Sequence, residues 1–522
     1  MSEITRRAVL RGAAGLAGVT ALGGLASCSR TTGTAVGPVA DAVAAAEAAR
    51  RKPGGRLVTA RLTPQPLTLD LGGRTVSTWA YGDTAPGPLL RATAGDVLRV
   101  DVDNQLPATT SVHWHGLALR NDMDGVPGMT QDPIASGGTF RYEFTAPHPG
   151  TYFYHPHSGV QLDRGLYGVL VVDDPDEPGR YDAEWIVVLD DWVDGTGRTP
   201  DQVLAELQQA GGEDSMGDDS MGDMHDMGGM GGMDGMDGMG HGSMGGSMGG
   251  TEAMQSPLLG GAGDIAYPHY LLNGKTPADP ATLSAKPGQR VRIRFVNAGS
   301  DTAFRIAVGG HRMTVTHSDG FPVVPVPTDA LLIGMGERFD ATVTLGDGVF
   351  PLVASAEGKQ GQALAVIRTG AGRPPTADIK VRELSGKVLL GTALSAAESV
   401  RLDPRPADRG HDLVLGGTMT PYRWTINGKT FPDADPLRLS QGERVRLRFV
   451  NQSMMFHPMH VHGHTFALTN GGARKDTVIV RPMATLDVDL EADNPGQWAT
   501  HCHNIYHAET GMMTTLSYQA QE

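Results

Sequence analysis

The chain has 522 residues, of which 40% are hydrophobic and 19% are charged, so most of it can bury an apolar core. At roughly 150 residues per domain its length predicts about three domains, and abundant Gly (71) and Pro (34) favour short strands and turns over long helices. The formal net charge of -15 argues against a nucleic acid partner.

The N-terminus, residues 1–28, resembles an export signal. It contains the pair Arg6-Arg7, followed by a small-residue apolar stretch that is too short to span a membrane. Cys28 ends a sequence that resembles a bacterial lipoprotein cleavage site, so a disulfide framework is not expected from the two cysteines. We expect twin-arginine export to the periplasm or cell envelope, with a lipid on Cys28 as the membrane contact and a tether over residues 29–54.

An internal repeat predicts the fold class. The segments Gly95–Asn104, Gly288–Asn297 and Gly442–Asn451 each read as a Gly-led turn and a strand that alternates with period two. Beyond the Asn, the first and third copies continue to His-x-His-Gly, whereas the second reaches Ile306-Ala307-Val308-Gly309 and has no histidine. The repeat predicts an all-β chain of three related β-sandwich domains over 55–176, 177–375 and 376–522, with the middle domain free of ligands.

One segment departs from this pattern. Residues 211–255 hold eleven of the 23 Met, many Gly and several Asp, but no Lys or Arg. Such a composition has too little apolar bulk to order alone, so we expect a disordered insertion in the second domain.

Ten of the 18 histidines fall in four clusters, one of which surrounds a cysteine. The clusters are His113/His115, His155/His157, His457/His460/His462 and His501/His503/His507. Cys502 lies between His501 and His503, and Met512 follows five residues after His507. A thiolate, imidazoles and a thioether at this spacing are typical of blue-copper sites. Because strand neighbours point to opposite faces, Cys502 would face one metal while its two neighbours face another.

These clusters resemble the copper motifs of the multicopper oxidases, from about residue 55 to the C-terminus, and look most similar to those of exported bacterial copper-resistance oxidases. The resemblance implies three cupredoxin-like Greek-key β-sandwich domains and four copper ions. It implies a type 1 copper on His457, Cys502 and His507 with Met512 as axial ligand. It implies a type 2 copper on His113 and His460, and a type 3 pair on His115, His155, His157, His462, His501 and His503.

The family resemblance also implies the reaction, in which one-electron oxidations at type 1 copper are coupled to reduction of O2 to water. Cys502, His501 and His503 would relay the electrons. Asp124 matches a family acid and is expected to donate protons or to anchor a metal ligand. A second family acid is replaced here by Ala508, so Glu509 or a water is expected to take its role.

The electron donor is left open between three hypotheses. Soft thioethers select Cu(I), so the Met-rich segment favours a cuprous oxidase for copper resistance, unless it is a mere spacer. Met454, Met455 and Met459 bracket His457 and would be either a closer Cu(I) dock or core side chains. The first alternative is a laccase that oxidises phenols, catechols or ferrous iron, and the second is a copper-buffering lipoprotein. We expect a monomer whose small-molecule partners are O2 and Cu(I) or phenolic donors.

Overall fold

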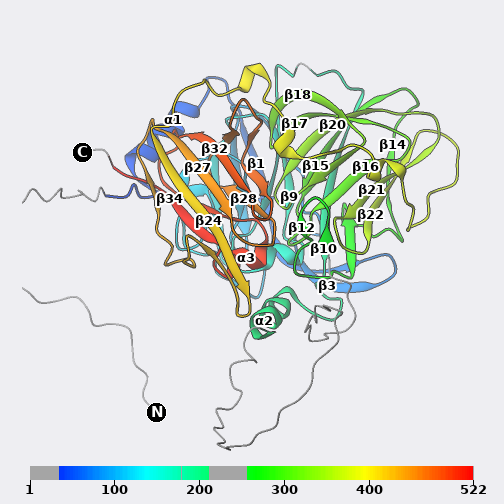
Figure 1. The fold of residues 1–522 in the computed structure, drawn as a ribbon, viewed down its shortest axis with the longest axis horizontal. Helices are drawn as coiled ribbons and strands as arrows, with labels where there is room; N and C mark the ends of the chain where they lie inside the picture. The colour runs from blue at the N-terminus through cyan, green and yellow to red at the C-terminus, as the bar shows by residue number, and fades with distance from the viewer. Residues whose placement is uncertain (1–33, 178, 211–254, 521–522) are drawn as a thin grey trace, which may run out of the picture.

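The computed structural model describes residues 34–177, 179–210 and 255–520, which form three β-sandwich units. In Figure 1 the second unit (green to yellow) lies beside the first (blue to cyan) and the third (orange to red). The expected all-β fold of three sandwiches is confirmed. The export signal over 1–28 with Cys28, and the Met-rich interval 211–254, lie outside the described residues.

The first unit has a three-stranded sheet in the order β1-β5-β7, a four-stranded sheet in the order β4-β9-β8-β6, and the hairpin β2-β3. Its strands are β1 (Leu57–Leu62), β2 (Pro64–Asp70), β3 (Thr75–Tyr81), β4 (Leu90–Thr93), β5 (Val97–Asp103), β6 (His113–His115), β7 (Thr139–Thr145), β8 (Gly150–His155) and β9 (Gly168–Asp173).

The second unit has two six-stranded sheets, β13-β10-β15-β20-β17-β18 and β14-β22-β21-β16-β19-β23, and the small pair β11-β12. Its strands are β10 (Ala183–Trp192), β11 (Gln255–Ser256), β12 (Gly260–Gly261), β13 (His269–Leu272), β14 (Ala281–Ser284), β15 (Arg290–Asn297), β16 (Phe304–Val308), β17 (Met313–Ser318), β18 (Phe321–Thr328), β19 (Ala330–Ile333), β20 (Arg338–Thr344), β21 (Val349–Ala356), β22 (Gln362–Arg368) and β23 (Val388–Leu389).

The third unit has a six-stranded sheet, β25-β24-β27-β32-β29-β30, and a five-stranded sheet, β26-β34-β33-β28-β31. Its strands are β24 (Arg409–Met419), β25 (Tyr422–Ile426), β26 (Leu437–Leu439), β27 (Arg444–Asn451), β28 (His457–Val461), β29 (Phe466–Leu468), β30 (Arg474–Lys475), β31 (Thr477–Val480), β32 (Thr485–Glu491), β33 (Gln497–Cys502) and β34 (Met513–Tyr518).

Helices are short, and their bounds are α1 (Asp41–Arg50), α2 (Pro200–Ala210) and α3 (Ile505–Glu509), with the 3-10 turns η1 (Asn121–Met123), η2 (Gln161–Arg164), η4 (Arg382–Ser385), η5 (Gly391–Ala393) and η6 (Glu398–Val400). Among the described helices, none combines the length and apolar character needed to cross a lipid bilayer.

The three repeat strands β5, β15 and β27 occupy equivalent places. Each pairs in parallel with the first strand of its unit's sheet and antiparallel with a later strand. In the opposite sheets, β6–β8, β16–β21 and β28–β33 are equivalent antiparallel pairs. The ligand-bearing strands of the first and third units therefore have a histidine-free counterpart in the second.

The Asn that ends each repeat explains why the pattern recurs. Asn104, Asn297 and Asn451 are buried, and the Oδ1 of each accepts the backbone N–H two residues further on at 2.9 to 3.0 Å. Their Nδ2 groups donate to carbonyls of that loop and of a neighbouring segment. One side chain thus satisfies the backbone where the chain crosses between sheets.

Replacing Asn297 with Ala should destabilise the second unit without touching a histidine cluster. The change leaves the buried carbonyls of Thr302 and Ile333 and the N–H of Gly299 without their partner. We expect a local loss of about 2–4 kcal/mol in unfolding free energy, since each orphaned buried group costs about 1–3 kcal/mol. Hydrogen–deuterium exchange in β15 and β16 measures this local loss of stability. The control is Asn470→Gly, since Asn470 is exposed. Equal protection in both variants would contradict this role.

Candidate metal centre

Eight histidines from the first and third units gather where these two units meet. They are His113 and His115 on β6, His155 at the end of β8, His157, His460 on β28, His462, His501 on β33, and His503. Seven are buried and His157 is half-buried. The strand registers explain the convergence, because His113 lies opposite His155 and His460 lies opposite His501.

The imidazoles form two groups of three and a pair. Nε2 of His501 lies 3.0 Å from Nε2 of His462 and 3.3 Å from Nε2 of His157. The ring of His503 lies 4.8 Å from that of His115 and 5.3 Å from that of His155, between centroids. The ring centroids of His113 and His460 are 5.8 Å apart. Each group takes ligands from both units, so the units must meet for it to form.

Backbone carbonyls orient several of these rings through one nitrogen. The Nδ1–H groups of His113, His155, His460 and His501 donate to the carbonyls of Asp124, Pro156, Asp476 and Cys502 at 2.8 to 3.0 Å. Fixing the proton on one nitrogen leaves the lone pair of the other free to bind a metal.

The ring nitrogens that make none of these hydrogen bonds are suited to bind metal ions. Nε2 of His113, His155 and His460, Nδ1 of His115 and both nitrogens of His503 are buried and have no hydrogen-bond partner among the described residues. Buried polar atoms are rarely left unpaired without a reason such as a missing ion. Imidazole nitrogen suits copper among the first-row metals, so the donor set fits the expected copper ions.

Burial also fixes the protonation state of these ligands. Desolvation lowers the pKa of His115, His155, His157, His462 and His503 well below the ordinary value, and lowers that of His501 to about 3. Neighbouring imidazoles add to this shift, because two adjacent rings cannot both become cations. These six imidazoles are therefore neutral near pH 7, as metal binding requires.

A second group lies in the third unit. Sγ of Cys502 lies 3.6 Å from Nδ1 of His457 and 3.6 Å from Nδ1 of His507, and these two nitrogens are 3.1 Å apart. Met512 is fully buried, and its backbone bonds to both Cys502 and His507. Burial raises the pKa of the Cys502 thiol, so a metal ion is needed to hold it as a thiolate. The group fits the expected type 1 ligands.

Polar partners hold the outer nitrogens of this second group. Nε2–H of His507 donates to Oδ2 of Asp264 at 2.9 Å, and Nε2 of His457 lies 2.8 Å from Oγ of Ser453. Asn504 caps α3 by accepting the backbone N–H of His507 at 3.3 Å, which places that side chain. The sequence did not single out Asp264 or Ser453, since neither belongs to a ligand motif.

Asp124 touches a histidine of each unit. Its Oδ2 accepts Nδ1–H of His462 at 2.9 Å, and its Oδ1 lies 3.2 Å from Nδ1 of His113. The carboxylate therefore lies behind two cluster histidines, in the place expected for an anchor of metal ligands.

Asp476 and Thr477 were missed by the sequence analysis. Oγ1 of Thr477 lies 3.0 Å from Nε2 of His115 and 3.0 Å from Nδ1 of His460, and Oδ1 of Asp476 lies 3.2 Å from the same nitrogen of His115. Burial disfavours the charged form of Asp476, but the neighbouring Arg338 outweighs it and holds the pKa of that carboxyl well below its usual range. Asp476 lies between β30 and β31 and Thr477 begins β31, and neither residue belongs to a ligand motif.

Glu509 lines a cleft of about 560 Å³ that reaches His157. The cleft also includes Ala508, Asp201 of α2, and residues of the first unit. The side chain of Glu509 is exposed to solvent at this cleft. Solvent thus meets the histidine cluster beside this carboxyl group.

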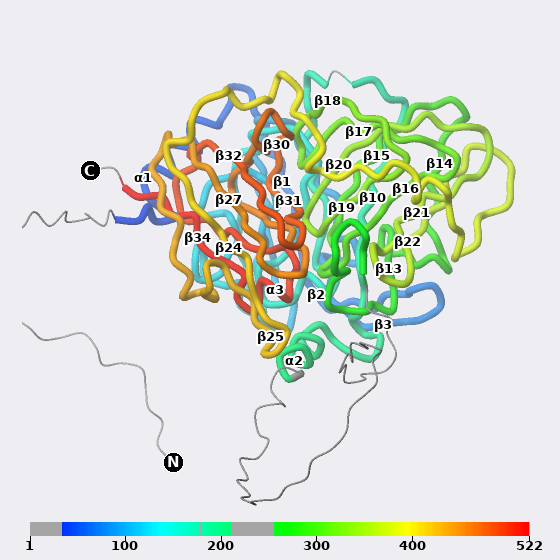
Figure 2. The backbone as a smooth tube through the Cα atoms, in the orientation of Figure 1, coloured from blue at the N-terminus to red at the C-terminus, as the bar shows by residue number. Residues whose placement is uncertain are grey.

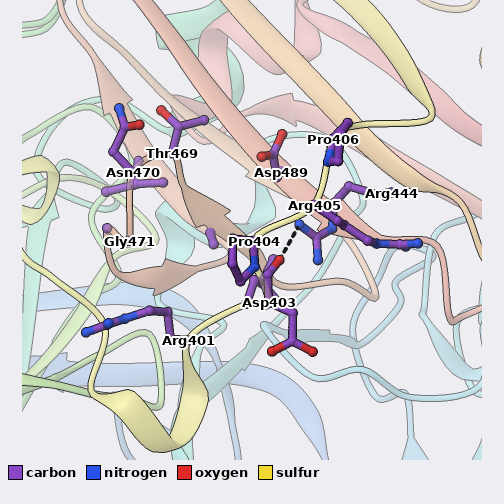
Figure 3. Close-up of a pocket in the computed structure, with 14 residues that line it drawn as sticks. Arg401, Asp403, Pro404, Arg405, Pro406, Arg444, Thr469, Asn470, Gly471 and Asp489 are labelled. Atoms are coloured by element: carbon purple, nitrogen blue, oxygen red, sulfur yellow. Dashed lines mark hydrogen bonds between the residues drawn. The ribbon is translucent and has the colours of Figure 1, made fainter.

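A separate pocket of about 670 Å³ lies on the third unit (Figure 3). Its lining includes Arg401, Asp403, Arg405, Arg444 and Asp489, and among the described lining residues there is no histidine or cysteine. Arg405 and Arg444 are already paired with Glu491. The described lining of this pocket therefore offers no ligand of the kind found in the metal centre.

The metal-free protein should lose stability on acidification. The buried imidazoles with a lowered pKa, such as those of His462 and His503, stay neutral in the folded protein but protonate near pH 6.5 when it unfolds. The unfolded state therefore binds more protons below about pH 6.5. We expect the urea midpoint to fall as pH drops from about 6.5 towards about 3, the value to which the pKa of His501 is lowered. A His462→Gln, His503→Gln double variant should flatten this fall. A midpoint that stays constant would contradict the prediction.

Comparisons with known proteins agree with this geometry. Models of the multicopper oxidase family match residues 65–177, 249–372 and 404–522. The chain is 50% identical to multicopper oxidase MmcO of Mycobacterium tuberculosis over 98% of this chain and 97% of that protein. It is 30% identical to a copper resistance protein A homolog of Pseudomonas syringae pv. tomato, over 82% of this chain and 86% of that protein.

Solved structures agree as well. The chain is similar to a multi-copper oxidase from Pseudomonas thermotolerans, with a TM-score of 0.65 and 25% identity over 89% of this chain and 100% of that one. The fold is also similar to that of a laccase from Botrytis aclada, with a TM-score of 0.70 and 24% identity over 89% and 88% of the two chains. Three family models match, and a relative is 50% identical over 98% of this chain, so this chain belongs to the multicopper oxidase family and is an oxidoreductase.

Proposed function

We propose that this multicopper oxidase oxidises Cu(I) and passes the electrons to O2. The observation that carries the proposal is that α2, before the Met-rich interval 211–254, contacts β25, whose Trp424 lies against His507, and that β12, after the interval, lies against Met455, two residues from His457. When bound, copper would supply one-electron transfer at the group of Cys502, His457 and His507 and four-electron reduction of O2 to water at the eight-histidine cluster. Cys502, His457, His507 and Met512 would hold type 1 copper. The eight histidines of the cluster would hold the type 2 and type 3 ions, as their motifs imply.

The N-terminal end of the Met-rich interval leaves from α2. This helix contacts β25, as Figure 2 shows, and Trp424 on β25 lies against His507 with 4.0 Å between ring centroids. The sequence predicts that the Met-rich segment belongs to the second domain, whereas the predicted type 1 ligands belong to the third. The helix that precedes the Met-rich interval therefore contacts a strand whose Trp424 lies against His507.

On the C-terminal side of the Met-rich interval, β12 lies against Met455, which is two residues from His457. A Cβ added at Gly261 would lie 2.7 Å from Sδ of Met455, and three residues later Asp264 binds His507. Met454 is 71% exposed, whereas Met459 is fully buried. Met454 and Met455 therefore offer thioethers for a Cu(I) dock, and Met459 is a core side chain. Thioether sulfur prefers Cu(I) over harder cations.

Electron transfer between the two metal groups needs only a few bonds. Cys502 is joined by its backbone to His501, which lies beside His157 and His462, and to His503, which lies beside His115 and His155. The thiolate at one end and the imidazoles at the other keep the donor apart from O2. Export by the twin-arginine route and a lipid on Cys28 would place this chemistry in the cell envelope.

Protons would reach the cluster through Glu509 and Asp124. Glu509 lines the cleft that leads to His157, and Asp124 lies behind His113 and His462. The carboxyl of Glu509 would thus take over from the acid that Ala508 replaces. Asp124 would keep its two histidines oriented while O2 is reduced.

Replacing the eleven Met of residues 211–254 with Ser, at constant length, should lower the rate of Cu(I) oxidation and leave phenol oxidation unchanged. The reason is that thioethers would collect Cu(I) near His507, whereas a phenol needs only the type 1 site. Oxygen uptake with each donor measures both rates. The matched control is a shuffled segment that retains all eleven Met. Equal effects on the two donors would refute the cuprous assignment and favour a laccase.

Replacing Glu509 with Gln should slow steady-state O2 consumption about tenfold or more, because a positioned proton donor contributes about 10²–10⁴-fold. Anaerobic reduction of the blue copper by the same donor should keep its wild-type rate. Asp201→Asn is the matched control, since Asp201 lines the same cleft but is paired with Arg164. Unchanged O2 consumption in the Glu509 variant would assign the proton path to water alone.

A further inference from the structure

We propose that Arg338, which belongs to the ligand-free second unit, is a positioning residue for the eight-histidine cluster. It acts by holding Asp476, which in turn holds His115 and His460. The inference rests on the copper assignment proposed above. It gives the second unit a part in the metal centre although that unit supplies no ligand.

Arg338 connects all three units through one buried side chain. It begins β20 and is fully buried, and its two terminal nitrogens donate to the two carboxylate oxygens of Asp476 at 2.6 Å each. Its Nε–H donates to the carbonyl of Thr151 on β8 of the first unit at 3.0 Å. Such two-pronged bonding fixes the plane of a carboxylate as well as its position.

The carboxylate that Arg338 holds lies directly behind two cluster histidines from different units. Oδ1 of Asp476 lies 3.2 Å from Nε2 of His115 and 3.5 Å from Nδ1 of His460, and it also accepts Oγ1–H of Thr477 at 2.8 Å. Thr477 is thereby oriented to accept Nε2–H of His115, while Nδ1–H of His460 donates to the backbone carbonyl of Asp476. A rotation of Asp476 would disturb the ring orientation and tautomer of His115 and His460 together.

Asp319, on the turn between β17 and β18, reinforces the same arrangement. Its Oδ1 accepts the backbone N–H of Arg338 at 2.8 Å, and its Oδ2 accepts those of Asp476 and Thr477 at 3.2 Å. Lys475 binds this carboxylate at 3.0 Å. The segment that carries Asp476 is thus held by the second unit at its backbone and at its side chain.

Glycine at positions 116 and 336 allows Arg338 and the turn before β20 to lie close to the cluster. A Cβ added at Gly116 would lie 2.3 Å from Nη2 of Arg338, and one added at Gly336 would lie 2.7 Å from Cδ2 of His503. Gly116 directly follows His115, so the guanidinium reaches Asp476 only because this position has no side chain. The turn before β20 therefore forms a wall of the cluster.

The test uses the full-length copper-loaded protein with Arg338→Lys and Arg338→Met. Lys keeps the charge but cannot bond both oxygens in one plane, so it should not rescue the function. Copper per chain is measured after dialysis against increasing chelator. The blue absorption reports type 1 copper, and electron paramagnetic resonance reports type 2 copper. We expect both variants to keep type 1 copper but to release the cluster copper about 10–100-fold more readily, as is usual when a hydrogen-bonding partner of metal ligands is lost.

Arg292→Lys and Arg292→Met are the matched controls. Arg292 is another buried arginine of the second unit, paired with Asp340 and Glu177, and no contact joins it to the eight histidines in the described residues. These controls should retain cluster copper like the wild type.

The inference is overturned if the Arg338 variants retain cluster copper as tightly as the wild type. It is also overturned if they lose type 1 copper in parallel, because general unfolding would then explain both losses. Should Arg338→Met not fold, Arg338→Lys still decides the question. A wild-type protein that never binds copper at the eight histidines would instead refute the proposed function.

Discussion

Burial of neutral imidazoles at the contact between two β-sandwich units is the constraint on which the rest of the structure depends. A neutral histidine that donates one ring N–H to a fixed acceptor keeps the lone pair of its other nitrogen free for a metal. Carbonyls of Asp124, Pro156 and Asp476 do this for His113, His155 and His460. The metal centre is therefore a property of how two units meet, and neither unit could build it alone.

The repeat and the four histidine clusters were predictable because they follow local rules. Alternation with period two marked β5, β15 and β27, and the spacing around Cys502 marked the ligands. The side chains that orient those ligands were not predictable. Asp264 meets His507 across 243 residues, and Arg338 meets Asp476 across 138, so no spacing in the sequence encodes either contact.

The three units separate what the fold requires from what the chemistry requires. Asn104, Asn297 and Asn451 keep the same hydrogen bonds in all three, whereas histidines occur at the equivalent strands of two only. The second unit has nevertheless kept surfaces that matter to the cluster. Its Gly336 lies against His503, its Arg338 holds Asp476 behind the cluster, and its Asp264 accepts a hydrogen bond from His507. The second unit therefore supports the metal centre although its repeat has no histidine ligands.

The most direct test of the central claim is to locate the metals in crystals of the copper-loaded protein by anomalous diffraction across the copper absorption edge. The account predicts one copper between Cys502, His457 and His507, and a separate group of three among the eight histidines. Zinc at these positions, or copper bound beside Cys502 with none among the eight histidines, would contradict it.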